Sequence, residues 1–240
     1  MCKKIVKNVY VFNKMSVYMY NEIDFNKIGF SNKPYKKIKK ILVDDNIIIK
    51  SIYYIDIDYS NQPLYVQIPT CKLENIENDI MTLVMDNNFY YNFIRLLEDN
   101  IIKAVYKNSE RWFLGKIFTI NKIMNCIVSC VEILDNGFVR LNVSYDTNLK
   151  LYDQYKNEIC FTDIINDKND TKNIKSDVKD VVCIMHIKNL QFIDNMFTYD
   201  LVMEQMKIYK VHKIIEYSII DTESCSSGSS KLLDEYYKEK

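Results

Sequence analysis

Residues 126–145, which read CIVSCVEILDNGFVRLNVSY, carry the clearest hairpin pattern of the chain. Residues 126–134 and 138–145 are rich in β-branched and aromatic side chains, and Asp135-Asn136-Gly137 separates them. Asn-Gly supplies the positive φ angles that a type I′ turn needs. This stretch therefore predicts two antiparallel strands joined by a type I′ turn.

An amphipathic helix is predicted just before this hairpin, over about residues 88–107. Steps of three and four residues place on one face Phe89, Tyr90, Phe93, Ile94, Leu97, Ile101, Val105 and Tyr106. Asp86 or Asn87 is suited to cap its N-terminus. We expect this helix to bury its apolar face against a sheet.

Further strands are predicted on both sides of the helix. Apolar or alternating runs occupy residues 47–59, 63–69, 79–85, 113–120 and 181–187. Residues 190–192 and 197–209 predict a second hairpin, which turns at Asp194-Asn195. The fold class that follows is α+β and β-rich, a barrel or sandwich of antiparallel strands with one amphipathic helix.

We expect one β-rich domain over residues 1–220, of which residues 1–60 are either a part or a separate N-terminal sheet segment. Residues 163–180 are polar and low in complexity, and we predict a mobile loop there. Residues 221–240 include a run of serines with one glycine, which predicts a flexible linker and tail.

Few residues of this chain suit catalysis. Four scattered glycines cannot form a Gly-rich phosphate loop, and the histidines are His186 and His212 alone. The seven cysteines are odd in number and contain no CxxC pair, as expected for core residues in a reducing compartment. We predict a protein that is not an enzyme, binds no cofactor or metal, has no membrane partner and is intracellular.

Charge is balanced overall, with 32 basic and 32 acidic residues, but its distribution is uneven. Residues 1–60 contain eleven lysines and six acidic residues, and the densest basic run is residues 33–40. Single-strand binders combine lysines that follow phosphates with aromatic rings that stack on bases. A candidate nucleic-acid site therefore consists of Lys33, Tyr35, Lys36, Lys37, Lys39, Lys40, Arg111, Trp112 and Phe113.

Two hypotheses stay open at this point. In the first, the lysine run and Trp112 lie on one concave face and bind single strands without sequence specificity. In the second, the lysines are a solvated edge, the 19 tyrosines fill half-exposed sheet positions, and the chain is a virion structural or assembly protein. Its partners would then be viral proteins or further copies of itself.

Three segments in order resemble a poorly characterised protein family of nucleocytoplasmic large DNA viruses. They are residues 63–69 (Pro-Leu-x-x-Gln-x-Pro), residues 108–113 (Asn-Ser-x-x-Trp-Phe), and a closing hairpin from Asn189 to Gln205-Met206-Lys207. The resemblance covers about residues 60–210. This viral family is in turn similar to phage-type single-stranded DNA-binding proteins.

The resemblance implies an OB-like barrel and single-stranded DNA as partner. It also implies a role in viral DNA replication or packaging, in the host cytoplasm, a viral factory or the virion. Phage-type proteins end in an acidic, aromatic tail that competes with DNA. This chain departs from that pattern, because three lysines offset the three acidic residues in KLLDEYYKEK.

Overall fold

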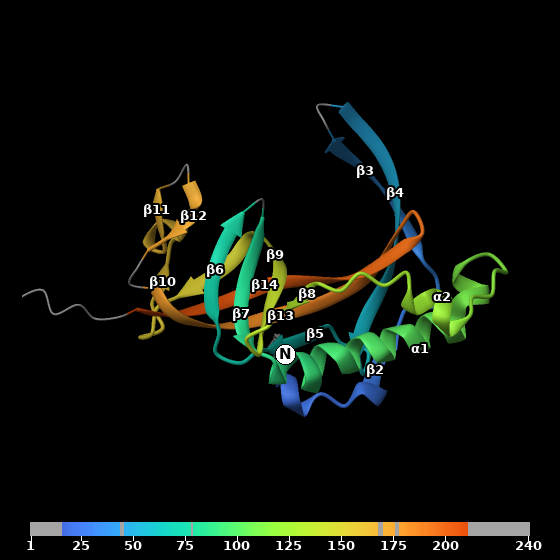
Figure 1. The fold of residues 1–240 in the computed structure, drawn as a ribbon, viewed down its shortest axis with the longest axis horizontal. Coiled ribbons are helices and arrows are strands. Elements are labelled where there is room, and N and C mark those ends of the chain that lie inside the picture. Colours follow the sequence, from blue (N-terminus) through green and yellow to red (C-terminus); the bar gives the residue numbers. More distant parts are fainter. Residues whose placement is uncertain (1–15, 44–45, 78, 168–169, 176–177, 211–240) are drawn as a thin grey trace, which may run out of the picture. The chain divides into compact units, whose positions relative to one another are not determined.

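The computed structural model describes residues 16–43, 46–77, 79–167, 170–175 and 178–210 (Figure 1). The strands are β1 Val17–Met19, β2 Ile28–Phe30, β3 Tyr35–Val43, β4 Asn46–Tyr59, β5 Leu64–Gln67, β6 Lys72–Glu77, β7 Ile80–Asp86, β8 Val131–Ile133, β9 Phe138–Tyr152, β10 Glu158–Ile159, β11 Ile165–Asp167, β12 Asp170–Ile174, β13 Val178–Ile193 and β14 Met196–Lys210. The helices are the short η1 Tyr20–Glu22, η2 Phe25–Lys27 and η4 Phe161–Asp163, the π-helical η3 Tyr90–Ile94, and α1 Arg95–Trp112 and α2 Ile120–Met124.

Five of these strands close a ring. β13 pairs with β14, β14 runs parallel to β9, β9 pairs with β7, and β7 pairs with β6. The ring returns to β13 where Cys71 and Val181 exchange two backbone hydrogen bonds of 2.9 and 2.8 Å. A five-stranded ring of this kind is the architecture of the OB fold, so the predicted β-rich, OB-like α+β class is confirmed.

Alternating side chains fill the interior of this barrel. Met81, Leu83 and Met85 of β7 are buried, and so are Val139 and Leu141 of β9. Successive residues of a strand point to opposite faces, so the intervening residues lie on the outside. Each fully buried aliphatic side chain stabilises the fold by about 1.5–3 kcal/mol relative to an exposed one.

The predicted helix begins where expected and ends later. The Asp86 carboxylate accepts a 2.7 Å hydrogen bond from the backbone N–H of Asn88, which confirms the cap. The helix runs on to Trp112 instead of ending at 107, because Val105 and Trp112, seven residues apart, both bury their side chains. Tyr199 of β14 ties the helix to the barrel by donating a 2.7 Å hydrogen bond to Glu98.

The strand predicted over residues 113–120 is wrong. Leu114 and Gly115 have φ angles of +53° and +86°, which reverse the chain directly after the helix. The next element is α2, whose N-terminus is capped by the hydroxyl of Thr119. The fold therefore has a second short helix that the sequence pattern did not predict.

The predicted hairpin forms as β8 and β9, but β8 covers only Val131–Ile133 of the strand predicted over residues 126–134, and the turn differs from the predicted type I′. Gly137 has a φ of +79°, whereas Asn136 does not have a positive φ, and Leu134 N–H donates to the carbonyl of Phe138 at 2.9 Å. This is a three-residue loop that ends in a left-handed glycine. The positive-φ pair of a two-residue turn occurs instead at Ser60 and Asn61, between β4 and β5.

The second predicted hairpin is confirmed and is longer than expected. β13 and β14 pair from Val178 to Ile193 around Asp194-Asn195. Within residues 163–180, where a loop was predicted, β11 and β12 pair as a short hairpin.

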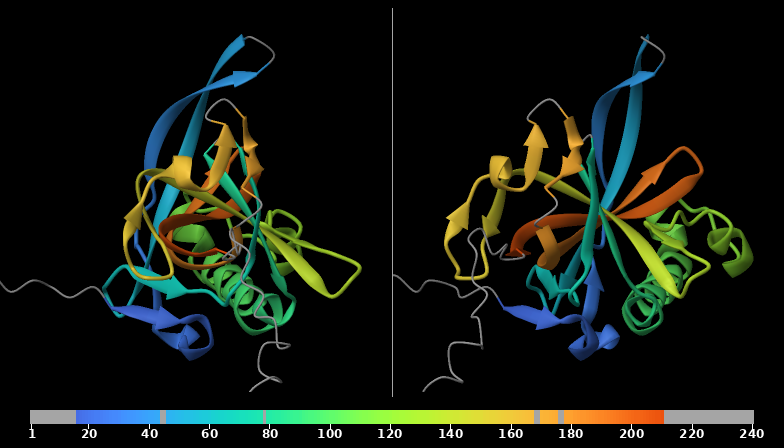
Figure 2. Two further views of the ribbon diagram at one scale, coloured as in Figure 1. Left: turned by 90° about the vertical axis from the view of Figure 1, so that its left-hand side faces the viewer. Right: turned by 60° about the vertical axis from the view of Figure 1, so that its left-hand side comes forward.

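The described part of residues 1–60 joins the same sheet. β4 pairs with β13 at Tyr53–Asp56 and with β2 and β3 on its other edge. β3 and the first half of β4 form a two-stranded ribbon that extends away from the barrel (Figure 2). The predicted linker and tail of residues 221–240 lie outside the described residues. None of the helices in the described residues is long and apolar enough to cross a bilayer.

Candidate nucleic-acid interface

The predicted lysine run lies at and along β3. Lys33 precedes the strand, while Lys36, Lys37, Lys39 and Lys40 belong to it. The side chains of Lys33, Lys36, Lys37 and Lys39 are exposed; that of Lys40 lies outside the described side chains. By strand alternation Lys37 and Lys39 share a face with Tyr35, and Lys36 lies on the other face.

Tyr35 is anchored in this ribbon. Its ring stacks on Tyr54 with centroids 5.4 Å apart and planes 17° apart, and the ammonium of Lys37 lies 5.4 and 5.3 Å from the two rings. Its hydroxyl donates a 2.9 Å hydrogen bond to Asp56. Burial, followed by this hydrogen bond, raises the pKa of Tyr35 to about 12. The hydrogen bond to Asp56 and the stacking on Tyr54 hold the ring in place.

The prediction that Trp112 stacks on bases is wrong, whereas stacking by Phe113 stays a prediction. Trp112 is only 5% exposed and lies 6.2 Å from Phe30, centroid to centroid. Phe113 packs edge-on against Phe118 and Phe192 at 5.1 and 5.0 Å. Trp112 belongs to the core because the helix turns its apolar stripe inward, whereas Phe113, directly after the helix, is half-buried and packs against the core.

Arg111, the residue before Trp112, is the one of these three predicted site residues that lies near the lysine run. It is exposed, and its guanidinium donates a 2.9 Å hydrogen bond to the side chain of Asn32, the residue before Lys33. The structure thus brings Arg111 to the start of the lysine run. Trp112 is buried, however, so the predicted binding surface that combined these lysines with the Trp112 ring does not form.

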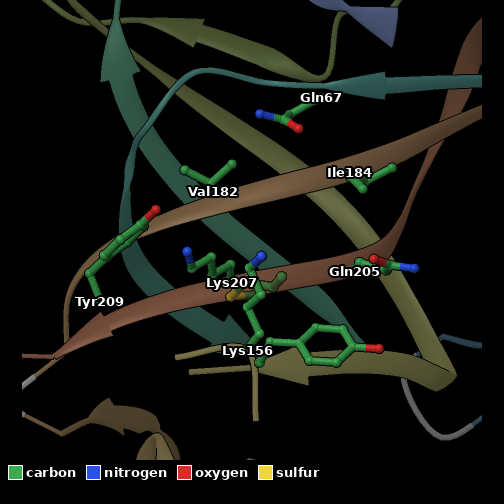
Figure 3. Close-up of a pocket in the computed structure, with 9 residues that line it drawn as sticks. Gln67, Lys156, Val182, Ile184, Gln205, Lys207 and Tyr209 are labelled. Atoms are coloured by element: carbon green, nitrogen blue, oxygen red, sulfur yellow. The ribbon is translucent and has the colours of Figure 1, made fainter. Parts of the chain in front are cut away.

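A groove that the sequence analysis did not predict lies on the outer side of the barrel (Figure 3). It has a volume of about 480 Å³. We call it the outer groove. It is lined by Gln67, Tyr152, Lys156, Val182, Ile184, Gln205, Met206, Lys207 and Tyr209. These residues come from β5, β9, β13, β14 and the turn after β9.

The outward direction of these side chains follows from strand register. Val181, Cys183 and Met185 are buried, so Val182 and Ile184 point outward. Ile184 pairs with Gln205 but Met185 pairs with Met203, so one residue of β14, Glu204, is extra. This bulge changes the alternation and turns Gln205, Lys207 and Tyr209 to the outside.

The outer groove contains cations beside aromatic rings over an apolar floor. The ammonium of Lys207 lies 5.0 Å from the ring centroid of Tyr209. Lys156 lies in the turn after β9 with a φ of +71°. Asn157 and Tyr155 hydrogen-bond the carboxylate of Asp153 in the same turn, which lowers the pKa of Asp153 and keeps this turn ordered.

A second aromatic pair lies next to the groove on the same sheet face. The rings of Tyr65 on β5 and His186 on β13 have centroids 4.7 Å apart. The carboxylate of Glu204 lies 3.6 Å from Nδ1 of His186. Burial lowers the pKa of His186 and raises that of Glu204, so both groups are shifted towards their neutral forms.

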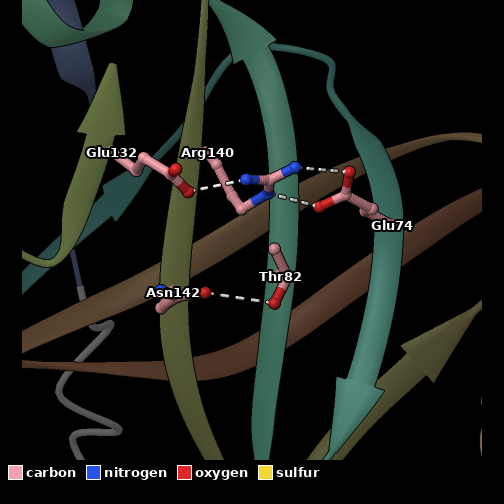
Figure 4. A network of polar contacts seen from close by, with 5 residues as sticks. All are labelled: Glu74, Thr82, Glu132, Arg140 and Asn142. Carbon is pink, nitrogen blue, oxygen red and sulfur yellow. Dashed lines mark hydrogen bonds and ion pairs between the residues drawn. The ribbon is translucent and has the colours of Figure 1, made fainter. Parts of the chain in front are cut away.

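The opposite face of the barrel, formed by β6, β7, β8 and β9, has a different character (Figure 4). The guanidinium of Arg140 is held by Glu74 at 2.6 and 3.0 Å and by Glu132 at 2.6 Å. These hydrogen bonds raise the pKa of Arg140 and lower that of Glu74. Because two carboxylates surround the one arginine, it is not available to neutralise a phosphate.

Two of the sequence segments singled out above meet in the outer groove. Gln67 comes from the segment of residues 63–69, and Gln205 and Lys207 come from the closing hairpin. The signal that could have found Tyr209 was the alternation of Gln205, Lys207 and Tyr209 with the buried Met206 and Ile208. Among the described residues, no group of three or more His, Cys, Asp or Glu side chains is placed to hold a metal ion.

No protein-family model matches this chain, and no curated protein matches its sequence. Among solved structures, the single-stranded DNA-binding protein from bacteriophage Enc34 is similar over 79% of this chain and 98% of its own, with 9% identity and a TM-score of 0.38. The same protein in complex with ssDNA is similar over 76% and 97%, with 10% identity and a TM-score of 0.37. For gp2.5, a single-stranded DNA binding protein encoded by bacteriophage T7, the shares are 82% and 98%, with 10% identity and a TM-score of 0.38. At this distance the likeness assigns neither an activity nor a binding residue to this chain.

Proposed function

We propose that this protein binds single-stranded nucleic acid through the outer groove. The observation that carries the proposal is the placement of Lys156 and Lys207 beside the rings of Tyr152 and Tyr209 in one groove of an OB-like barrel. Rings of this kind stack on bases of any sequence, and lysines neutralise the phosphates between them. A barrel of this type offers a rigid surface on which such groups are held.

The lysine run extends this surface. Leu190 and Phe192 are buried, so Gln191 points to the outer side of β13. Tyr54, its partner in β4, lies on the same side of the sheet by register, where its ring is itself buried, stacked on Tyr35 and contacted by Lys37. Tyr35 pairs in turn with Tyr54 and shares its face with Lys37. Lys37 and Lys39 therefore lie on the same side of the sheet as the outer groove, and we assign them phosphate contacts at its far end.

The test is binding of a fluorescent mixed-sequence oligonucleotide, followed by anisotropy between about 50 and 200 mM salt. We expect affinity to fall steeply with salt. The double variant Lys156→Gln/Lys207→Gln should bind more weakly, with a slope of log affinity against log salt that is smaller by about 0.7 for each lost phosphate contact.

The matched control is Lys72→Gln/Lys103→Gln, which removes two exposed lysines on β6 and α1, away from the groove. This control, and Arg140→Gln on the opposite face, should keep the affinity and the salt slope. Absence of binding by the unaltered protein, or equal losses in the groove and control variants, contradicts the proposal.

A second candidate is a structural or assembly role through protein contacts. Ile38 and Ile49 on the β3–β4 ribbon are 67% and 65% exposed, and Tyr53 is 45% exposed. All three lie on the face opposite to Lys37 by strand alternation. Sedimentation of the full chain that shows an oligomer, abolished by Ile38→Lys/Ile49→Lys, together with no oligonucleotide binding, would favour this candidate.

The cellular role that we propose is replication or packaging of viral DNA, in line with the family resemblance of the sequence. The protein would then act in the host cytoplasm, in a viral factory or in the particle. Co-purification with viral DNA from infected cells tests this role.

A further inference from the structure

We propose that the outer groove holds one base by its two polar edges, and that this base is adenine. The inference rests on the proposed function, and it adds a base preference at one nucleotide position to otherwise sequence-tolerant binding. It is carried by two glutamine side chains, Gln67 and Gln205, that lie on either side of an apolar floor.

The geometry is set by three adjacent strands. Ile184 of β13 pairs with Gln67 of β5 on one side and with Gln205 of β14 on the other. Neighbouring strands lie about 4.8 Å apart, so the two glutamine Cα atoms are separated by about 10 Å. Figure 3 shows the two carboxamides on opposite sides of Ile184. A flat base fits on the isoleucine between them.

Both carboxamides are available to a ligand. Within the described residues, neither the Gln67 nor the Gln205 side chain makes a hydrogen bond to the protein. Gln67 is half-buried and Gln205 is exposed. Among the described residues, neither carboxamide belongs to the fully buried polar groups without a partner, so both reach solvent and can exchange water for a ligand with matching polar groups.

The chemistry of the amide selects the base. A carboxamide presents one acceptor and one donor side by side. Adenine presents the complementary pair twice, because its N6 amine carries two hydrogens, one beside N7 and one beside N1. Gln and Asn therefore bind adenine through N6 and N7 with two hydrogen bonds.

Other bases fit two facing carboxamides less well. Guanine offers two acceptors, O6 and N7, on its major-groove edge, which suits Arg or Lys better than an amide. Cytosine and thymine have one edge that carries only C–H or methyl groups beside their single polar edge. Guanine pairs a donor with an acceptor on its Watson–Crick edge, N1–H beside O6, but not on its Hoogsteen edge. Only adenine presents a donor beside an acceptor on both of these edges.

The remaining groove residues suit the rest of a nucleotide. Tyr152 and Tyr209 provide rings for the same base or its neighbours, and Lys156 and Lys207 provide charges for the flanking phosphates. Lys207 already lies over the ring of Tyr209. Its ammonium is therefore directed to the side of the groove and not between the two amides.

The test compares short thymine oligonucleotides that differ at one central position. We expect the oligonucleotide with a central adenine to bind about tenfold more tightly than the all-thymine one, in the range of one good bidentate contact. Replacing this adenine by 7-deazaadenine, which lacks N7, or by unsubstituted purine, which lacks the N6 amine, should remove most of the gain.

The variants Gln67→Leu and Gln205→Leu should each lower the affinity for the central-adenine oligonucleotide more than the affinity for the all-thymine one, so that the adenine preference shrinks towards equal binding. The matched control Gln191→Leu changes a glutamine on the same sheet face, outside the groove, and should keep the preference. Circular dichroism and thermal melting establish that each variant is folded.

The outcomes separate the two proposals. Equal binding of all oligonucleotides, an equal gain for unsubstituted purine, or a preference for guanine overturns the adenine site and leaves single-strand binding in place. Failure of every oligonucleotide to bind overturns the proposed function itself. A preference that persists in both glutamine variants overturns the assignment of these residues.

Discussion

At the scale of single residues, Trp112 decides between two positions for the binding site. As the chain's one tryptophan, buried against Phe30, it reports directly on the core. We expect its emission to be blue-shifted and unquenched by a saturating oligonucleotide. Trp112→Phe should keep the oligonucleotide affinity, and Trp112→Ala should destabilise the fold by about 3–5 kcal/mol. Strong quenching on binding would mean that the ring faces the ligand.

His186 gives the fold a dependence on pH. It contacts Tyr65 of β5 and faces Glu204 and Asp200 of β14, with Lys188 beside it in β13. Burial, with Lys188 second, lowers its pKa below the ordinary 6.5, so the unfolded chain takes up a proton at a higher pH than the folded protein does. Its contribution to stability is therefore complete above pH 6.5 and is lost as the pH falls from 6.5 towards the folded pKa.

Urea unfolding at about pH 5.5 and about pH 7.5 measures this effect. The unaltered protein should lose more stability between the two values than His186→Gln does, because glutamine does not titrate. An equal loss in both proteins would show that other groups, such as Glu204, cause the dependence.

At the scale of elements, the packing of β2 on β4 depends on one glycine. A Cβ atom at Gly29 would lie 2.6 Å from Oδ1 of Asp58. The same oxygen accepts a 2.9 Å hydrogen bond from the backbone N–H of Asn61, in the turn that leads into β5. Gly29→Ala therefore has to move Asp58 and break this contact.

We expect Gly29→Ala to destabilise the protein by about 1–3 kcal/mol, measured by urea unfolding. Asp58→Ala removes both the clash and the hydrogen bond. In that background, Gly29→Ala should therefore lower the free energy of unfolding much less than it does in the unaltered protein. An equal loss of unfolding free energy in both backgrounds would show that the contact with Asp58 does not cause the destabilisation.

The sequence predicted the long helix and both hairpins because their signals are local. The period of Leu97, Ile101 and Val105 marks a buried helix face, and the same period already placed Trp112 on that face. The lysine run was identified from residue composition, but composition does not tell on which face of the fold a side chain lies. A helix periodicity that is followed to its last turn would have assigned Trp112 to the core.

The outer groove was not predictable in this way. Its lining joins Gln67, Lys156 and Lys207, which are far apart in sequence, and their meeting depends on which strands pair. It also depends on the extra residue Glu204 in β14, which decides the face on which Gln205 and Lys207 lie. A shift of one residue moves every side chain of a strand to the other face, and no local pattern fixes that shift.

At the scale of the whole described molecule, the outer side of the sheet has two basic ends and a middle in which three carboxylates outnumber one lysine, Lys188. Lys37 and Lys39 lie at one end, and Lys156 and Lys207 at the other. Between them the register places Asp56 beside Asn189, Asn189 beside Asp200, and then Glu204. A nucleic-acid strand that contacts both ends has to pass these carboxylates.

This arrangement predicts that the acidic middle limits affinity. A carboxylate about 7 Å from a phosphate opposes binding by about 0.6 kcal/mol in water, which is about threefold in affinity. Asp200→Asn/Glu204→Gln should therefore strengthen binding of an oligonucleotide long enough to reach both ends, by up to about tenfold at low salt. The gain should shrink as salt shortens the Debye length below about 10 Å.

The control is Asp135→Asn/Glu110→Gln, which removes two exposed carboxylates outside this sheet face and gives the same net charge. A short oligonucleotide that fills only the outer groove should gain less from Asp200→Asn/Glu204→Gln than the long one. If the control variant gains as much as the test variant, net charge and not the path of the strand determines affinity. If the long oligonucleotide gains nothing, the strand does not cross the middle, and the β3 lysines do not bind the same molecule as the outer groove.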